Sequence, residues 1–177
     1  MAKPKRISLR EFQEGLVRRL TSAARGESSR ALLGVLSGRD YWLMNLSDAG
    51  EIVPLPQLTE VPLTKKWFAG IANIRGTLYS VVDFSAFLGG EPTPRNSDAR
   101  LLLAGARHGI NSALLVSRTL GLKNPESLEA SPLAEDQPDN DTRPWVGECY
   151  RDKQGISWRV LRIKPLLGFA EFLDIGI

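Results

Sequence analysis

Residues 67–89 read Trp-Phe-Ala-Gly-Ile-Ala-Asn-Ile-Arg-Gly-Thr-Leu-Tyr-Ser-Val-Val-Asp-Phe-Ser-Ala-Phe-Leu-Gly. Two apolar runs flank the dipeptide Arg75-Gly76, and this pattern predicts a β-hairpin. Asp83 follows the second run, where we expect it to cap a short helix over residues 84–88. The stretch therefore predicts a unit made of strand, turn, strand and helix.

This unit recurs farther along the chain, after a linker-like stretch at residues 89–98. The apolar runs that begin at Arg30 and Arg100 also match each other. We therefore expect two related lobes, about 29–90 and about 99–177, each a small β-barrel closed by a short helix. Lobes of this size bury little surface alone, so they should pack together. A shift of 79 residues maps Gly76, Val81, Phe84, Leu88 and Gly89 onto Gly155, Val160, Ile163, Leu167 and Gly168, and a shift of 70 maps Arg30, Leu32 and Leu33 onto Arg100, Leu102 and Leu103.

Both ends of the chain have helical patterns. Residues 1–28 form an expected helical extension, in which Ser8 and Glu11 fit a capping box and an apolar stripe follows through residue 20. This helix over residues 8–24 either packs on its own domain or docks on a partner. A second short helix is expected over residues 165–173, with Pro165 in its first turn.

The charge of the chain is unevenly distributed. The 177 residues carry 23 Lys and Arg against 20 Asp and Glu, a net charge of +3. Residues 1–30 alone hold a net +5, so the remainder is slightly acidic, and residues 126–142 hold six acidic groups and no basic one. A basic chain invites a nucleic-acid interpretation, but a general phosphate-binding surface is not distributed in this way.

Several classes of function are disfavoured by the residue inventory. No apolar run approaches the ~18 residues of a membrane span, and no secretory signal is evident, so the cytoplasm is expected. One cysteine, Cys149, and one histidine, His108, exclude a disulfide framework and a multi-cysteine zinc site. Cys149 is expected to be buried, and His108 to be exposed in a turn. We therefore expect no enzyme, no metal and no cofactor.

The opening hairpin resembles the signature of the CheW-like family. Gly70, Asn73, Arg75, Gly76 and Asp83 have the spacing of that signature. Glu51-Ile52 and residues 59–62 resemble its upstream elements, and the likeness extends over residues 30–170. Val116-Ser117 departs from the Val-Asp step usual in the second lobe. The long extension and residues 78–84 look most like members that serve pilus-associated (twitching motility) chemosensory systems.

The resemblance implies a mainly β fold of two SH3-like five-stranded barrels and a non-catalytic adaptor role. Such adaptors couple the cytoplasmic tips of chemoreceptors to the regulatory domain of a CheA-type histidine kinase. They work at receptor arrays on the inner face of the membrane. The resemblance implies neither nucleic-acid binding nor membrane insertion.

Carried over by position, the resemblance also assigns site residues. Glu51 and Arg75 are expected to form an ion pair beside the receptor groove, although Arg75 is as readily interpreted as mainly structural. Gly70, Asn73 and Gly76 are expected to shape the hairpin backbone, and Asp83 to cap the helix. Candidates for apolar groove walls are Ala49, Ile52, Leu115 and Val116, for which packing in the core is at least an equal alternative.

Three alternatives remain open from the sequence. The first stays within the family and places the adaptor in a flagellar pathway. The second is a nucleic-acid-binding double β-barrel with a basic N-terminal arm, which predicts binding that weakens steeply with salt. The third is an unrecognised enzyme, which the residue inventory disfavours.

Overall fold

The computed structural model describes residues 31–104, 108–132 and 142–177. The helix expected over residues 8–24 and part of the acidic stretch at 126–142 lie outside these residues. The described chain is mainly β, as expected. Its strands are β1 (Leu32–Ser37), β2 (Asp40–Asn45), β3 (Ala49–Pro54), β4 (Phe68–Ile74), β5 (Thr77–Asp83), β6 (Arg100–Ala104), β7 (Ser112–Val116), β8 (Arg118–Lys123), β9 (Leu128–Ser131), β10 (Val146–Asp152) and β11 (Ser157–Leu161).

The strands form two sheets, with the orders β8-β1-β2-β11-β10-β9 and β3-β6-β7-β5-β4. In the first sheet β8 and β9 are at opposite ends, yet only the 3-10 turn η4 (Pro125–Ser127) separates them in the chain. One bent stretch therefore pairs with β1 on one side and β10 on the other. The six strands thus close into a five-stranded barrel, which protects the edges of the sheet.

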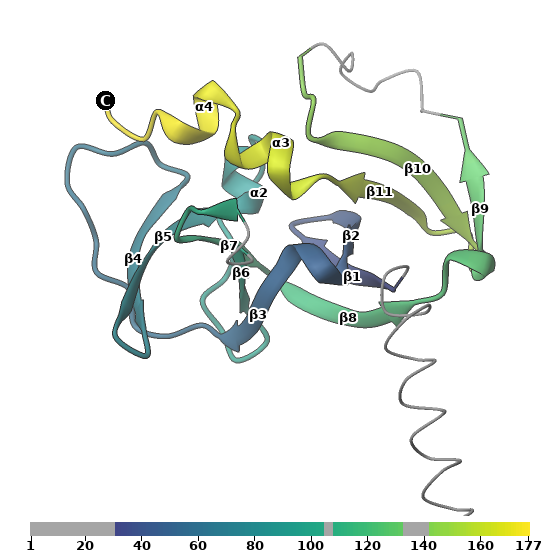
Figure 1. Cartoon of the computed structure of the whole chain (residues 1–177), viewed down its shortest axis with the longest axis horizontal. Coiled ribbons are helices and arrows are strands. Elements are labelled where there is room, and N and C mark those ends of the chain that lie inside the picture. The colour runs from purple at the N-terminus through teal and green to yellow at the C-terminus, as the bar shows by residue number, and fades with distance from the viewer. Residues whose placement is uncertain (1–30, 105–107, 133–141) are drawn as a thin grey trace, which may run out of the picture.

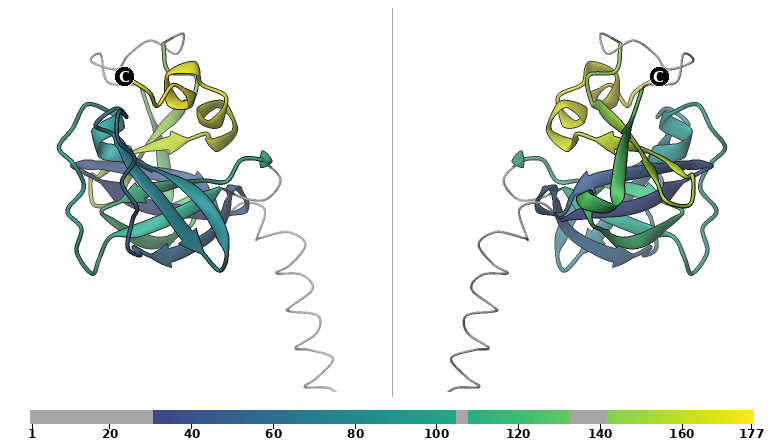
Figure 2. Two further views of the ribbon diagram at one scale, coloured as in Figure 1. Left: turned by 90° about the vertical axis from the view of Figure 1, so that its left-hand side faces the viewer. Right: turned by 90° about the vertical axis from the view of Figure 1, so that its right-hand side faces the viewer.

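The second sheet closes at the corresponding place. The chain continues from β3 to Thr59, whose N–H donates to the carbonyl of Ile71 in β4 at 2.8 Å and whose carbonyl accepts from the N–H of Ile71 at 2.8 Å. Here too the two ends of the sheet meet. The barrels lie side by side, with the short helices packed above the line between them (Figure 1), and two side views show each barrel end-on (Figure 2).

The barrels do not follow the contiguous lobes expected at 29–90 and 99–177. The first hairpin, β1–β2, lies in one barrel with β8 to β11, and β6–β7 lies in the other with β3 to β5. The two sequence repeats have therefore exchanged their first hairpins. Each exchange is made by a parallel pairing, β2 with β11 and β7 with β5, and such pairings are not visible in local sequence patterns.

The strand registers support the internal repeat itself. Leu43 pairs with Val160 in the first barrel, and Ala113 pairs with Val81 in the second. Shifts of 70 and 79 residues convert the first pair into the second. The repeat found in the sequence is therefore a repeat of structure, with the same offsets at the junction of the exchanged hairpins.

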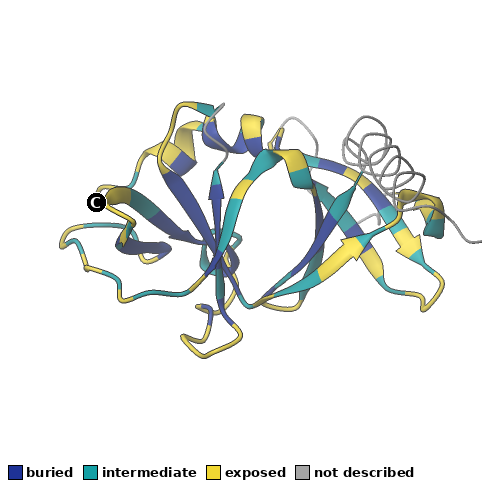
Figure 3. Cartoon of the chain, turned by 60° about the horizontal axis from the view of Figure 1, so that its bottom comes forward, coloured by how far each residue is buried: buried dark blue, intermediate teal, exposed yellow. Residues whose placement is uncertain are grey.

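One buried cluster spans both barrels. It contains Trp42 from the first barrel and Val82 from the second, together with Trp145 and Phe84 between them. Trp42 packs edge-on against Phe84, with ring centroids 5.2 Å apart, and lies 6.0 Å from Trp145. Buried side chains line both barrels, whereas the outer loops are exposed (Figure 3). The shared cluster ties the barrels together because neither can withdraw without exposing it.

Three short helices accompany the barrels. Helix α2 (Phe84–Phe87) follows β5, and α3 (Ile163–Leu167) follows β11, as the repeat predicts. The single C-terminal helix expected over 165–173 is wrong, because the helix breaks at Gly168 and resumes as α4 (Ala170–Leu173). Phe169 has extended backbone angles (φ −75°, ψ 126°), which interrupts the helical hydrogen bonds. None of the helices in the described ranges is long and apolar enough to cross a membrane.

Candidate partner-binding site

The turn of the β4–β5 hairpin presents Arg75 at the surface. Ile74 pairs with Thr77, so Arg75 and Gly76 alone make the turn. Both have positive φ, 52° and 86°, as a type I′ turn requires. The Asn73 side-chain oxygen accepts a 2.8 Å hydrogen bond from the Gly76 N–H, which holds the turn. Arg75 therefore pays a conformational cost that glycine avoids, and the fold retains it at the most exposed point of the hairpin.

Arg75 binds Glu51 of β3 through two parallel hydrogen bonds. Its guanidinium nitrogens donate to the two carboxylate oxygens of Glu51, at 3.1 and 2.7 Å. The expected ion pair is confirmed. The Arg75 side chain is 77% exposed and that of Glu51 is 39% exposed, so the pair lies at the surface rather than partly buried. An exposed pair of this kind contributes little to stability, typically ~0–1 kcal/mol.

Gly70 lies where the second barrel closes. Its φ of 125° is unfavourable for side-chain residues. A Cβ at this position would also overlap the carbonyl oxygen of Thr59, the residue that bridges to Ile71. The expected backbone role of Gly70 is confirmed, and its cause is the close approach of the crossing strand. Gly76 differs, because nothing lies within 4 Å of a Cβ built there.

Asp83 caps α2, as expected, and also anchors the chain that follows. Its carboxylate accepts from the backbone N–H of Ala86 at 3.3 Å. It further accepts from the backbone N–H and the hydroxyl of Thr93, both at 2.7 Å. Asp83 and Thr93 are 5% and 6% exposed. This buried carboxylate therefore ties the linker at 89–98 to the end of β5.

The four apolar candidates separate into two pairs. Ala49 and Ile52 of β3 are half-buried beside Glu51 and pack against the shared cluster. Leu115 and Val116 of β7 are 1% and 0% exposed. The expectation that these two line a groove is wrong for this structure, because β7 lies in the middle of its sheet and both of its faces are covered. Only Ala49 and Ile52 thus remain near a surface.

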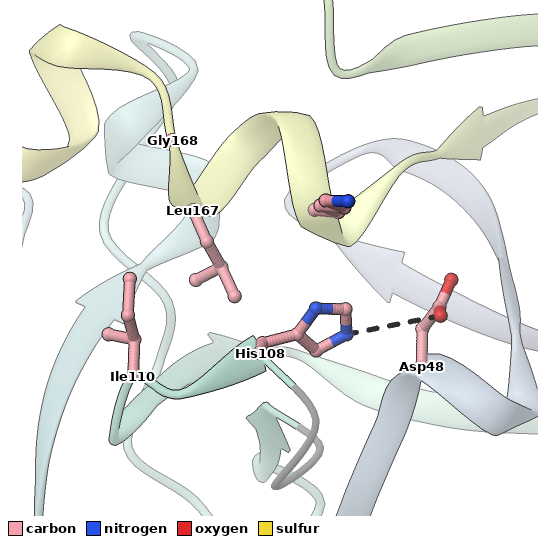
Figure 4. A pocket seen from close by; sticks show the side chains of 6 residues that line it. Asp48, His108, Ile110, Leu167 and Gly168 are labelled. Carbon is pink, nitrogen blue, oxygen red and sulfur yellow. Dashed lines mark ion pairs between the residues drawn. The ribbon is translucent and has the colours of Figure 1, made fainter.

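His108 was expected in an exposed turn, but its side chain is 6% exposed. Its Nε2 lies 3.9 Å from a carboxylate oxygen of Asp48, in the 3-10 turn η2 (Leu46–Asp48) between β2 and β3. These residues line a cavity of about 630 Å³ with Ile110, Lys164, Leu167 and Gly168 (Figure 4). A single histidine in a polar turn gives no local sign of such burial. Cys149, by contrast, is buried as expected.

The equivalent turn of the other barrel is held by Asp152, which lies 79 residues beyond Asn73. Its carboxylate accepts from the Trp158 indole N–H at 3.0 Å, and from the backbone N–H groups of Ile156 and Gln154, each at 2.9 Å. The Trp158 hydrogen bond is the main cause that lowers the pKa of Asp152 below its ordinary value. The two hairpin turns thus use a carboxamide and a carboxylate in the same position.

The second barrel also carries a surface ion pair. Arg162 donates to Glu148 at 2.9 Å, beside the β10–β11 hairpin. The pKa of Glu148 is lowered, first by a hydrogen bond from its own backbone N–H and then by Arg162. The described ranges contain no group of three or more His, Cys, Asp and Glu side chains placed to hold a metal ion.

Two barrels joined by exchanged hairpins, with exposed ion pairs on their outer faces, define a scaffold protein rather than an enzyme. The chain belongs to the CheW-like domain family, whose profile matches residues 31–171. Proteins of this family are non-catalytic coupling proteins of chemotaxis signal transduction, and they interact with chemoreceptors and the kinase CheA.

Two known proteins illustrate the relationship. Protein PilI of Pseudomonas aeruginosa is 24% identical over 147 residues, which is 82% of this chain and 79% of PilI. The crystal structure of the scaffolding protein TtCheW from Thermoanaerobacter tengcongensis matches with a TM-score of 0.60 at 17% identity. The match covers 75% of this chain and 88% of TtCheW, and it supports the fold.

Proposed function

We propose that this protein is the coupling adaptor of a pilus-associated chemosensory system. It would link the cytoplasmic tips of chemoreceptors to the regulatory domain of a CheA-type histidine kinase in the control of twitching motility. The observation that carries the proposal is the likeness to PilI, which extends over 82% of the chain. The adaptor would work in the cytoplasm, at receptor arrays on the inner face of the membrane.

The partner-binding face in this proposal centres on Glu51 and Arg75. The two residues are exposed, and the bidentate pairing fixes both side chains in one orientation. Ala49 and Ile52 supply half-buried apolar surface on the same strand as Glu51. A charged pair beside small apolar side chains suits a helical partner, whose apolar face meets the strand while its polar residues meet the pair.

Individual contacts of such an adaptor are modest, and an array makes them effective through repeated copies. No bond is made or broken by the protein, so its function depends on surface geometry alone. The residue roles proposed here therefore require folding and binding to be measured separately.

The proposal is tested by deleting the gene from its own organism and recording both twitching and swimming chemotaxis. We expect the loss of regulated twitching with swimming chemotaxis intact, and recovery when the wild-type gene is returned. The reverse pattern would place the protein in a flagellar pathway and would overturn the pilus assignment. Returning the Arg75→Ala variant, at matched protein levels, tests whether the proposed face is needed.

A further inference from the structure

The cavity beside His108 has two chemically different walls. Three ionisable side chains, those of Asp48, His108 and Lys164, lie on one wall. Ile110 and Leu167 provide the apolar wall, and Figure 4 shows both lying on the side of the imidazole away from Asp48. Its volume, about 630 Å³, falls within the range of ligand-binding pockets.

Three separate elements build the cavity at the junction of the barrels. Asp48 belongs to η2, through which the chain crosses from the first barrel to the second. Ile110 lies in the connection between β6 and β7, and Lys164 lies in α3, after the last strand of the first barrel. A ligand here would contact both barrels at once, at a place separate from the hairpin turn that carries Arg75.

The charges of the cavity select the kind of ligand. Lys164 is exposed and forms no ion pair with any residue in the described ranges, so its ammonium group is available. Asp48 is only 13% exposed and already faces His108 at 3.9 Å. A ligand carboxylate is therefore attracted toward Lys164 and repelled from Asp48, and this opposition fixes its orientation.

The apolar wall completes the specification. Ile110 is 39% exposed, which is high for a large aliphatic side chain, and Leu167 beside it is 5% exposed. An aliphatic group placed against Ile110 would remove this surface from water, which is favourable. The ligand that uses both walls carries an aliphatic group next to a carboxylate.

We propose that this cavity is a second docking site, which accepts an acidic side chain and an adjacent aliphatic side chain from a partner protein. The inference rests on the proposed adaptor function only in taking a protein as the source of the ligand. The carboxylate lies toward Lys164, the aliphatic group lies on Ile110 and Leu167, and Asp48 sets the direction by repulsion.

The test titrates the full-length, ¹⁵N-labelled protein with the peptide acetyl-Glu-Leu-amide and follows amide chemical shifts. The matched neutral peptide is acetyl-Gln-Leu-amide. We expect the acidic peptide to shift the amides of Ile110, Leu167 and Gly168 and to bind more tightly than the neutral one. Equal binding of both peptides, shifts confined to other surfaces, or no binding would overturn the proposal.

Two variants move the affinity in opposite directions. Lys164→Gln should weaken binding of the acidic peptide about two- to fivefold, the range of an exposed ion pair. Asp48→Asn should strengthen it, because the repulsion is removed. Lys153→Gln changes an exposed lysine in the β10–β11 turn and serves as the matched control, with no expected effect.

These outcomes are distinct from those of the proposed function. The titration contains neither receptor nor kinase, so its failure leaves the adaptor assignment untouched. A failed pilus assignment in the deletion experiment likewise leaves the peptide titration unchanged. If Lys164→Gln binds the acidic peptide as the wild type does, or if Asp48→Asn weakens binding in a folded protein, the site is wrong.

Discussion

Glu51 and Arg75 join the two ends of one sheet. Glu51 lies on β3, the first strand in the order of the second sheet, and Arg75 follows β4, the last strand in that order. Their ion pair therefore crosses the seam at which the barrel closes, on the same side as the bridge between Thr59 and Ile71. A surface contact that contributes little to stability thus fixes the relative position of two strand ends at a face we assign to partners.

The seam predicts unequal effects of two glycine substitutions. Gly70→Ala adds a Cβ that overlaps the Thr59 carbonyl and strains a positive φ, so it should destabilise the protein by about 3 kcal/mol or more. Gly76→Ala introduces strain without overlap and should cost about 1–2 kcal/mol. Urea unfolding of both variants checks this. Equal losses would show that close approach of the backbone is not what requires Gly70.

The buried carboxylate of Asp83 predicts a large loss of stability when it is removed. Asp83→Ala deletes the helix cap and leaves two donors of Thr93 unsatisfied, a cost of about 2–4 kcal/mol. Thr93→Val removes one of these hydrogen bonds and should cost less. Thermal or urea unfolding measures both. A loss at Asp83 no greater than that at Thr93 would contradict the anchoring role.

Asp152 predicts a pH dependence of stability. Its pKa is lowered in the folded protein, mainly by the Trp158 indole, relative to an unfolded value near ~3.9. The stabilisation is therefore complete above that pH and is lost as the pH falls through the lowered folded value. The unfolding temperature of the wild type should fall more steeply with acidification than that of Asp152→Asn. Parallel curves for the two proteins would rule out this contribution.

The exchanged hairpins predict that half of the chain does not fold alone. A fragment of residues 1–95 contains β1 to β5 but lacks the strands that β2 and β5 pair with, β11 and β7. In a barrel rebuilt from this half, Trp42 would occupy the place of the small, buried Ser112, which the packing does not allow. We expect no cooperative thermal transition by circular dichroism. A sharp transition would contradict the dependence of each barrel on both repeats.

Local features of the fold were predictable from the sequence. The hairpin of Phe68–Asp83, its Arg75-Gly76 turn and the cap at Asp83 follow from turn residues and apolar runs, and the structure contains all three. Strands β8 and β9 were not predicted. Their residues are mostly half-buried or exposed and are interrupted by Gly121 and Pro125, so no clear alternation marks them.

Features that depend on the arrangement of distant strands were not predictable from the sequence. The exchange of hairpins rests on parallel pairings between strands far apart in the chain. The burial of His108 depends on η2 and α3, which approach it from elsewhere. Leu115 and Val116 have the same apolar character whether they line a groove or a core, and only the central place of β7 decides between these.

The most direct test of the proposed partner-binding face measures folding and binding of Arg75→Ala together. Binding to a receptor-tip peptide and to the regulatory domain of the kinase is compared with urea unfolding of the same variant. We predict a change in the free energy of unfolding of less than about 1 kcal/mol, because the pair is exposed, with clearly weakened binding to at least one partner. Wild-type affinity for both partners in an equally stable variant would contradict the assignment of this face.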